Sequence, residues 1–172
     1  MLMQDNQFRL INLDQNTEPL EIDGLIERLV ALMTRMYDYH ASLHQDWQTY
    51  EGWQQGSTQW LKRSLASEEW LRVLLFPHDG NTACGYILAS FHYEAPLFIQ
   101  NRFGYIVDLW IDEKFRGRGG AELLLNAAFD WFRHANVSRL QLEVDLRNQI
   151  GKRFWHKKGF EDFQIVMRRN LA

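Results

Sequence analysis

The chain alternates between stretches with apolar residues at helical spacing and stretches where apolar residues run together. The longest helical pattern starts at Leu20 and keeps its apolar residues on one face as far as Tyr37, with charged residues opposite. Ser57 is a suitable N-cap for a second helix, and Gly159 is a suitable terminator for the last one. Together, the patterns predict helices over residues 20–37, 57–66, 121–135 and 149–158, and residues 37–44 either continue the first helix or form a loop.

Runs of β-branched and aromatic residues lie between the predicted helices. The run that ends at Ile111 is apolar apart from Asp108, which suits a largely buried strand. A turn that starts at Pro77 separates two neighbouring runs and predicts a hairpin. Strands are predicted over residues 8–13, 70–76, 83–93, 103–111, 139–144 and 160–167. This order of elements predicts an α/β fold in one domain over residues 1–172.

A basic, glycine-rich loop joins the predicted strand over 103–111 to the predicted helix over 121–135. Residues 116–120 contain three glycines and two arginines. Glycine lacks a Cβ atom and adopts positive φ readily, so the main chain can approach a ligand closely here. The amides and the dipole of a helix start attract anions, so the loop suits a pyrophosphate, with Arg116 and Arg118 as further contacts. From the glycines alone, an ordinary turn with exposed arginines is the alternative.

The motifs around this loop resemble those of one enzyme family. The sequence has no P-loop lysine motif, and Glu122 stands where a dinucleotide-binding loop needs its third glycine. Instead, Arg116-Gly117-Arg118-Gly119-Gly120-Ala121 resembles the Arg/Gln-x-x-Gly-x-Gly/Ala loop of the GNAT family of N-acetyltransferases. Asn148 and the pair Gly159-Phe160 follow in the order in which that family has an asparagine and an aromatic-x-x-x-Gly-Phe helix end.

The resemblance covers residues 103–169 by motif and the rest of the chain by the order of elements. It implies a mixed, mostly antiparallel sheet of six to seven strands, flanked by about four helices and splayed between its fourth and fifth strands. It also implies acetyl-CoA as cosubstrate, with the pantetheine arm along the fourth strand and the pyrophosphate on the loop amides. The cofactor-binding residues implied are Leu109, Trp110, Ile111, Arg116, Gly117, Arg118, Gly119, Gly120, Ala121, Glu122, Asn148, Phe154 and Trp155.

Trp155 marks a departure from the family. It stands where members commonly have a tyrosine that protonates the coenzyme thiolate, and an indole N–H does not titrate usefully. The thiolate therefore leaves unassisted, a water serves as the acid, or another group such as Tyr93 or Tyr105 takes this role.

Asp108 is the preferred candidate for the general base. It is an acidic residue in an apolar strand beside the expected cofactor site, where burial raises the pKa of a carboxyl group towards a useful range. Its position resembles that of an aspartate in polyamine-type members of the family. A structural pairing with a neighbouring arginine or tyrosine is the alternative role. Glu143 and Asp145 on the next predicted strand are further candidates for the base.

Aromatic and polar residues between the first two helices are candidates for acceptor binding. The substrate-binding residues expected are Tyr37, Asp38, His40 and Trp47, because aromatic rings and an acid suit a cationic amine. For the later tryptophans Trp60 and Trp70, a tryptophan-rich core is at least as good an explanation as a substrate pocket. His40 and His44 have the spacing of a helical metal pair, but no third ligand lies nearby in the sequence, so no metal site is predicted.

Composition narrows the class of protein. The 172 residues are 46% hydrophobic and 24% charged, with a net charge of −3, which suits a globular domain and disfavours a nucleic-acid binder. Cys84 is the only cysteine, so no intrachain disulfide is possible and a reducing compartment is expected. No signal peptide and no membrane-spanning run is evident, so a cytoplasmic protein without membrane partners is predicted.

The predicted function is acetyl transfer from acetyl-CoA to a primary amine by direct attack in a ternary complex. The favoured acceptor is a small cationic amine of the polyamine, amino acid or aminoglycoside type. A protein N-terminus or lysine, a non-catalytic acyl-CoA-binding or regulatory module, and an interaction domain without a cofactor are the alternatives. The family resemblance also suggests a homodimer.

Overall fold

The structure, a computed structural model, describes residues 7–169 and divides into two compact units. The first unit ends at Leu142 and the second begins at Glu143. The elements of the first unit are β1 (Phe8–Asn12), α1 (Pro19–Leu43), η1 (Gln45–Trp47), α2 (Trp53–Ser64), β2 (Trp70–Pro77), β3 (Gly85–Tyr93), β4 (Arg102–Ile111), η2 (Glu113–Phe115), α3 (Gly120–His134) and β5 (Leu140–Gln141). The second unit contains α4 (Gln149–Lys157).

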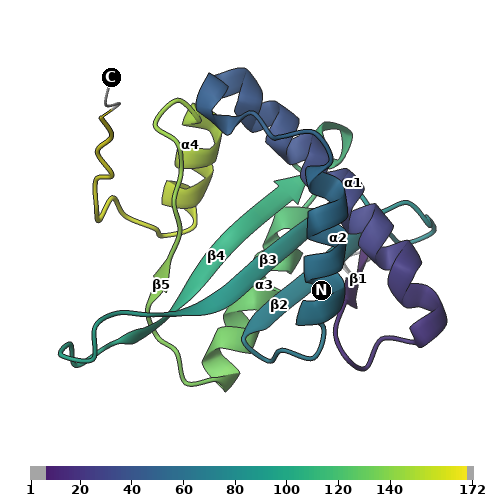
Figure 1. The fold of residues 1–172 in the computed structure, drawn as a ribbon, viewed down its shortest axis with the longest axis horizontal. Helices are drawn as coiled ribbons and strands as arrows, with labels where there is room; N and C mark the ends of the chain where they lie inside the picture. Colours follow the sequence, from purple (N-terminus) through teal and green to yellow (C-terminus); the bar gives the residue numbers. More distant parts are fainter. Residues whose placement is uncertain (1–6, 170–172) are drawn as a thin grey trace, which may run out of the picture. The chain divides into compact units, whose positions relative to one another are not determined.

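A five-stranded sheet in the order β1-β2-β3-β4-β5 forms the centre of the first unit. The first four strands pair antiparallel, and β5 joins β4 in parallel after the crossover through α3. Figure 1 shows α1 and α2 on one side of this sheet and α3 on the other. This arrangement confirms the expected α/β fold with a mixed, mostly antiparallel sheet.

Alternate residues of β3 contribute to two different layers of the core. Tyr86 and Leu88 belong to the buried cluster that includes the apolar face of α1. Phe91 lies on the opposite face and packs against Phe132 of α3, with 5.7 Å between ring centroids. Gly104 of β4 has no side chain to keep α3 away, and a Cβ atom there would overlap the Phe132 ring. Along β3, Tyr86 and every second residue from it therefore face α1, whereas Phe91 and every second residue from it face α3.

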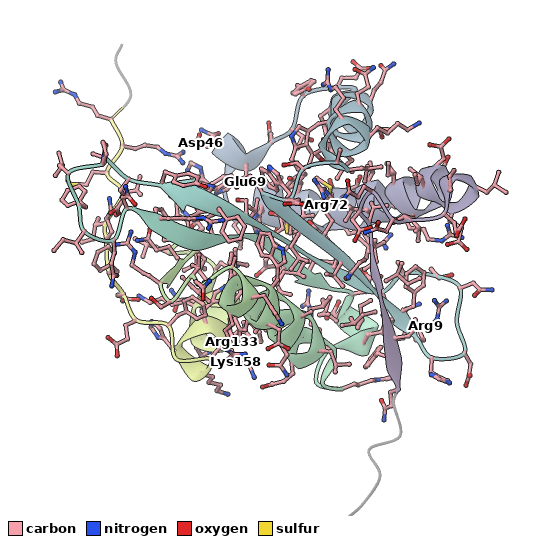
Figure 2. The ribbon with its side chains drawn as sticks, turned by 90° about the horizontal axis from the view of Figure 1, so that it is seen from below. Arg9, Asp46, Glu69, Arg72, Arg133 and Lys158 are labelled. Carbon is pink, nitrogen blue, oxygen red and sulfur yellow. The ribbon has the colours of Figure 1, made fainter. Side chains whose placement is uncertain are left out.

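Arg72 of β2, labelled in Figure 2, is a charged residue of the α1 and α2 side with only 1% of its surface exposed. Its Nε atom donates to Ser64 Oγ over 3.1 Å, and its Nη2 atom donates to the main-chain oxygen of Ser64. A further Nη1 bond of 3.3 Å reaches the carbonyl of Trp70. Burial lowers the pKa of Arg72 to about 10, although the charge of Asp14 opposes this effect. These hydrogen bonds thus link the C-terminal end of α2 to β2.

The sheet has fewer strands than expected. Among residues 7–169 the structure contains five strands rather than six to seven, because the segment over 160–167 is not in a strand. The strand expected over 139–144 forms as β5 but is shorter. β5 pairs with β4 only through Leu140 and Gln141. Residues 161–169 are exposed in the second unit. Strand propensity alone does not make a strand, since a partner must supply the main-chain hydrogen bonds.

The structure decides between the two possibilities for residues 37–44 and moves the start of α2. α1 continues past Tyr37 to Leu43, which brings a further turn of aromatic residues into the helix. α2 begins at Trp53 after Gly52, whose φ is +81°, so the expected N-cap Ser57 lies inside the helix. None of the helices within residues 7–169 has both the length and the apolar character needed to cross a membrane.

Candidate active site

A β-bulge in β4 decides which way the acidic residue of that strand faces. Leu88 of β3 is paired with Asp108 and Ala89 with Ile106, so Val107 is the extra residue of the bulge. In a regular strand, residues 106 and 108 would face the same side. Because the bulge intervenes, Ile106 shares the α3 face and is buried, whereas Asp108 lies opposite Leu88 on the face covered by α1.

Two tyrosines from different elements lie near Asp108. The Tyr86 hydroxyl, fully buried on β3, donates to Asp108 Oδ2 over 3.3 Å. Tyr37 of α1 is close enough for the charge of Asp108 to raise its pKa, although burial is the larger cause. Burial also raises the pKa of Asp108 to about 6, and the hydrogen bond from Tyr86 acts in the opposite direction. The carboxyl group is therefore an acceptor that changes its charge slightly below neutral pH.

A row of aromatic rings leads away from this carboxyl group. Trp110 shares the face of Asp108, and its ring centroid lies 5.8 Å from that of Tyr39. The Tyr39 ring lies 5.9 Å from His40, which lies 6.0 Å from Trp47 in η1. These side chains come from β4, the last turns of α1 and η1, and Trp47 is 38% exposed. Aromatic faces in such a row suit a cationic or planar ligand.

The second half of β4 presents main-chain groups on the side away from β3. The amide of Asp112 donates to Cys84 O over 2.8 Å, which fixes the alternation of main-chain groups along this part of the strand. The groups of Trp110 therefore point to β3, and those of Leu109 and Ile111 point away from it. Within the described chain, β5 pairs with β4 only at Gly104 and Tyr105. An extended ligand can hydrogen-bond to Leu109 and Ile111 as an added strand would.

The glycines of the loop over 116–120 have two separate functions. Gly117 and Gly119 have φ values of +73° and +85°, and a Cβ atom on either would have no neighbour within 4 Å. Gly120 is buried, and a Cβ atom there would lie 2.6 Å from Leu75 of β2. The first two glycines thus set the path of an open loop, and the third lets α3 start close to the sheet.

The two arginines of the loop lie against aromatic rings. Arg116 Nε donates to Ile111 O over 3.0 Å, and its guanidinium group lies 4.9 Å from the Trp110 ring centroid. Arg118 lies 5.8 Å from the Phe115 ring centroid. Arg116 is therefore held by the end of β4, next to the loop that it begins.

The second unit holds the remaining residues that the sequence singled out. Asn148 is the N-cap of α4, and its Oδ1 atom accepts from the amide of Gly151 over 2.9 Å. The Trp155 ring packs edge-on against Phe154 and Phe160, with centroid distances of 5.0 and 5.3 Å. Glu143 and Asp145 also belong to this unit. Local packing and capping thus account for the order of α4 by itself.

The structure brings together some of the expected acceptor-site residues and not others. Tyr37 lies near Asp108, while His40 and Trp47 belong to the aromatic row. Asp38 is exposed on α1. No local pattern in the sequence pointed to Tyr86, because its contact with Asp108 depends on the pairing register of β3 and β4. In the described part of the chain, no three His, Cys, Asp or Glu residues form a group that could hold a metal ion.

Two tyrosines considered as proton donors lie elsewhere on the sheet. Tyr93 is 61% exposed at the end of β3, and its hydroxyl donates to Glu69 over 3.2 Å. The Tyr105 ring stacks on His92, with centroids 4.4 Å apart.

Comparison with known proteins identifies the sequence family. The model of the acetyltransferase (GNAT) family matches residues 32–160. A relative, the uncharacterized N-acetyltransferase YycN of Bacillus subtilis (strain 168), is 30% identical over 67 residues. That match covers 39% of this chain and 43% of the relative, so the chain matches less than half the length of that protein.

Solved structures of low sequence identity share the fold. A tetramutant of the BH1408 protein of Bacillus halodurans has a TM-score of 0.77 and 19% identity, over 95% of this chain and 99% of that one. A predicted acetyltransferase from Clostridium acetobutylicum, solved with acetyl-CoA, has a TM-score of 0.74 and 17% identity, over 95% of this chain and 96% of that one. The aminoglycoside acetyltransferase meta-AAC0020 from an uncultured soil metagenomic sample, solved with sisomicin, has a TM-score of 0.70 and 13% identity, over 98% of this chain and 99% of that one.

Proposed function

Because the chain belongs to the acetyltransferase (GNAT) family, we propose that it transfers an acetyl group from acetyl-CoA to a primary amine. The family model spans both compact units, which supports one acetyltransferase domain made of the whole chain. The proposed reaction is direct transfer with both substrates bound, and Asp108 acts as the general base.

The observation that carries this proposal is the run of features along the second half of β4. The outward main-chain groups of Leu109 and Ile111 lead directly to an open glycine loop and the first amides of α3. An acyl-CoA has a matching order of groups, since an amide-bearing arm is followed by a pyrophosphate. The arm would pair with β4, and the pyrophosphate would lie on the amides of residues 117–122. When bound, the thioester supplies an activated acetyl group.

Asp108 fits the task of accepting a proton from the acceptor amine. It lies on β4 one residue before Leu109, and its pKa of about 6 leaves most of it ionised at neutral pH. A base works best when its pKa is close to the working pH while it remains in the accepting form. We infer that removal of the ammonium proton, directly or through a water, is its role. Trp155 receives no acid role, since its indole does not titrate.

The acceptor proposed is a small cationic amine. The aromatic row from Trp110 to Trp47 supports this choice, because aromatic faces attract cations. The carboxylate of Asp108 adds a negative charge on the same face of β4. Aminoglycoside acetyltransferases of the same fold include one solved with sisomicin, which also supports this class of acceptor.

A panel of amines tests the proposed function. The purified protein is mixed with acetyl-CoA and polyamines, amino acids or aminoglycosides, and release of free thiol is followed together with the mass of the product. We expect turnover with at least one class and an increase in product mass equal to one acetyl group. Tight CoA binding with no turnover on any amine would instead favour a non-catalytic acyl-CoA-binding module, the alternative that Trp155 supports.

A further inference from the structure

Tyr86 is a buried phenol that the proposed reaction has not yet used. Its hydroxyl lies 3.3 Å from Asp108 Oδ2 and 3.3 Å from the sulfur of Met36 in α1. None of its surface is exposed. A buried hydroxyl loses its water partners, so leaving its proton without an acceptor is unfavourable. The two atoms within reach therefore decide where this O–H group points.

The carboxylate is the better of the two acceptors. A thioether sulfur accepts hydrogen bonds weakly, whereas an ionised carboxylate accepts them strongly. A single hydroxyl proton serves one of them at a time, so ionisation of Asp108 turns the Tyr86 O–H group towards Oδ2. The bulge at Val107 contributes to the same result, because it brings Asp108 to the face where Tyr86 lies.

We propose that Tyr86 is a positioning residue whose hydroxyl holds the Asp108 carboxylate in its ionised form and in one orientation for proton transfer. This inference rests on the proposed function, in which Asp108 is the base. Tyr86 itself does not contact the reacting atoms in this scheme. Its contribution passes through Asp108 alone.

The other groups that face Asp108 are consistent with this assignment. Among the described elements packed around it, Tyr86 of β3 and Tyr37 of α1 are titratable groups that both interact with the charge of Asp108. Burial, and then the charge of Asp108, raise the pKa of both tyrosines, so both remain protonated wherever Asp108 titrates. Tyr37 stacks edge-on against Trp53 at 4.9 Å, and Tyr86 provides the direct hydrogen bond.

Tyr86→Phe tests the inference, with Tyr93→Phe as the matched control. Both substitutions remove only a hydroxyl from a tyrosine of β3 that donates to a carboxylate, but Tyr93 is exposed and bonds to Glu69. The pKa of Asp108 is measured by carbon NMR on protein labelled at the aspartate carboxyl carbons, and the resonance is assigned as the one lost in Asp108→Asn. The pH profile of kcat/KM is measured alongside, and a thermal melt checks folding.

We expect Tyr86→Phe to raise the pKa of Asp108 by about one unit, because a hydrogen bond to the ionised form is lost. The acidic limb of the kcat/KM profile moves up by the same amount, so activity falls about fivefold at pH 6 and little above pH 8. Tyr93→Phe leaves both measurements unchanged. An Asp108 resonance that titrates identically in Tyr86→Phe would overturn the inference, as would a shifted resonance with an unshifted acidic limb.

Failure of the proposed function gives a different result. If Asp108→Asn keeps full activity, Asp108 is not the base and Tyr86 cannot act through it in catalysis. The NMR titration is independent of activity, so it still decides whether Tyr86 holds the carboxylate.

Discussion

Replacing Asp108 by asparagine is expected to stabilise the protein while it removes the base. Burial raises the pKa of Asp108 from 3.8 to about 6, so ionising this group at neutral pH lowers the free energy of unfolding. The unfolded chain binds fewer protons than the folded protein between these two values. Stability contributed by this site therefore falls as the pH rises from 4 to 6.

The size of the effect follows from the same two pKa values. Each unit of difference corresponds to about 1.4 kcal/mol, so the ionised carboxylate lowers the free energy of unfolding by about 3 kcal/mol at pH 8. At pH 4 the corresponding loss is only about 0.5 kcal/mol. An asparagine of similar shape carries no charge and avoids this loss. For a chain of this size, 3 kcal/mol corresponds to about 6–12 °C in Tm.

The assay compares thermal unfolding of Asp108→Asn and the natural protein from pH 4 to pH 8, with turnover measured at pH 8. We expect the difference in Tm to grow with pH while kcat falls by about 100-fold, the usual contribution of a general base. Asp112→Asn is the control, because Asp112 accepts from Arg35 and from the Trp110 indole at 2.8 and 2.9 Å. Its replacement should lower Tm. A difference in Tm for Asp108→Asn that does not change with pH would refute the reasoning.

Three further substitutions test the glycine loop, the aromatic row from Trp110 to Trp47, and the core. Gly119→Val should weaken CoA binding by about 100-fold in calorimetry, because it removes one or two phosphate contacts. Gly52→Val is the control: it introduces similar left-handed backbone strain at the start of a helix, but the protein should bind CoA normally. Trp47→Ala should raise KM for the amine about tenfold with little change in KM for acetyl-CoA. Equal changes in both would contradict the proposed role of the aromatic row in binding the amine. Arg72→Met should lower the free energy of unfolding by about 2 kcal/mol in urea, because the Ser64 groups lose their donor, and a neutral result would mean that apolar packing compensates.

The sequence was sufficient for the long helices and the loop. The apolar period after Leu20 and the glycines of residues 116–120 are local signals, and the structure has a helix and a helix-starting loop there. Asp108 stood out because a charge in an apolar strand is rare. These features depend on residues close together in the chain.

Other parts of the site depend on distant pairing that local patterns do not report. The bulge at Val107 has no sequence mark, yet it decides which face Asp108 occupies. Tyr86 meets Asp108 only through the register of β3 and β4. Ser57 had the chemistry of an N-cap, but Gly52 supplies the backbone conformation at which α2 starts. The strand expected over 160–167 does not form for a related reason, since strand propensity does not provide a partner strand.

The extra residue in β4 lets the two halves of the strand face their layers independently. Loss of the single codon for Val107 would let the ladder between β3 and β4 close without interruption, and Ile106 and Asp108 would keep their opposite faces as neighbours in a regular strand. A change that kept Val107 but straightened the strand would instead turn one half of β4 over, and the acid would then share a side with Ile106. The position of the acid is therefore tolerant of a deletion at this point of the chain and sensitive to a slip of one residue in the register.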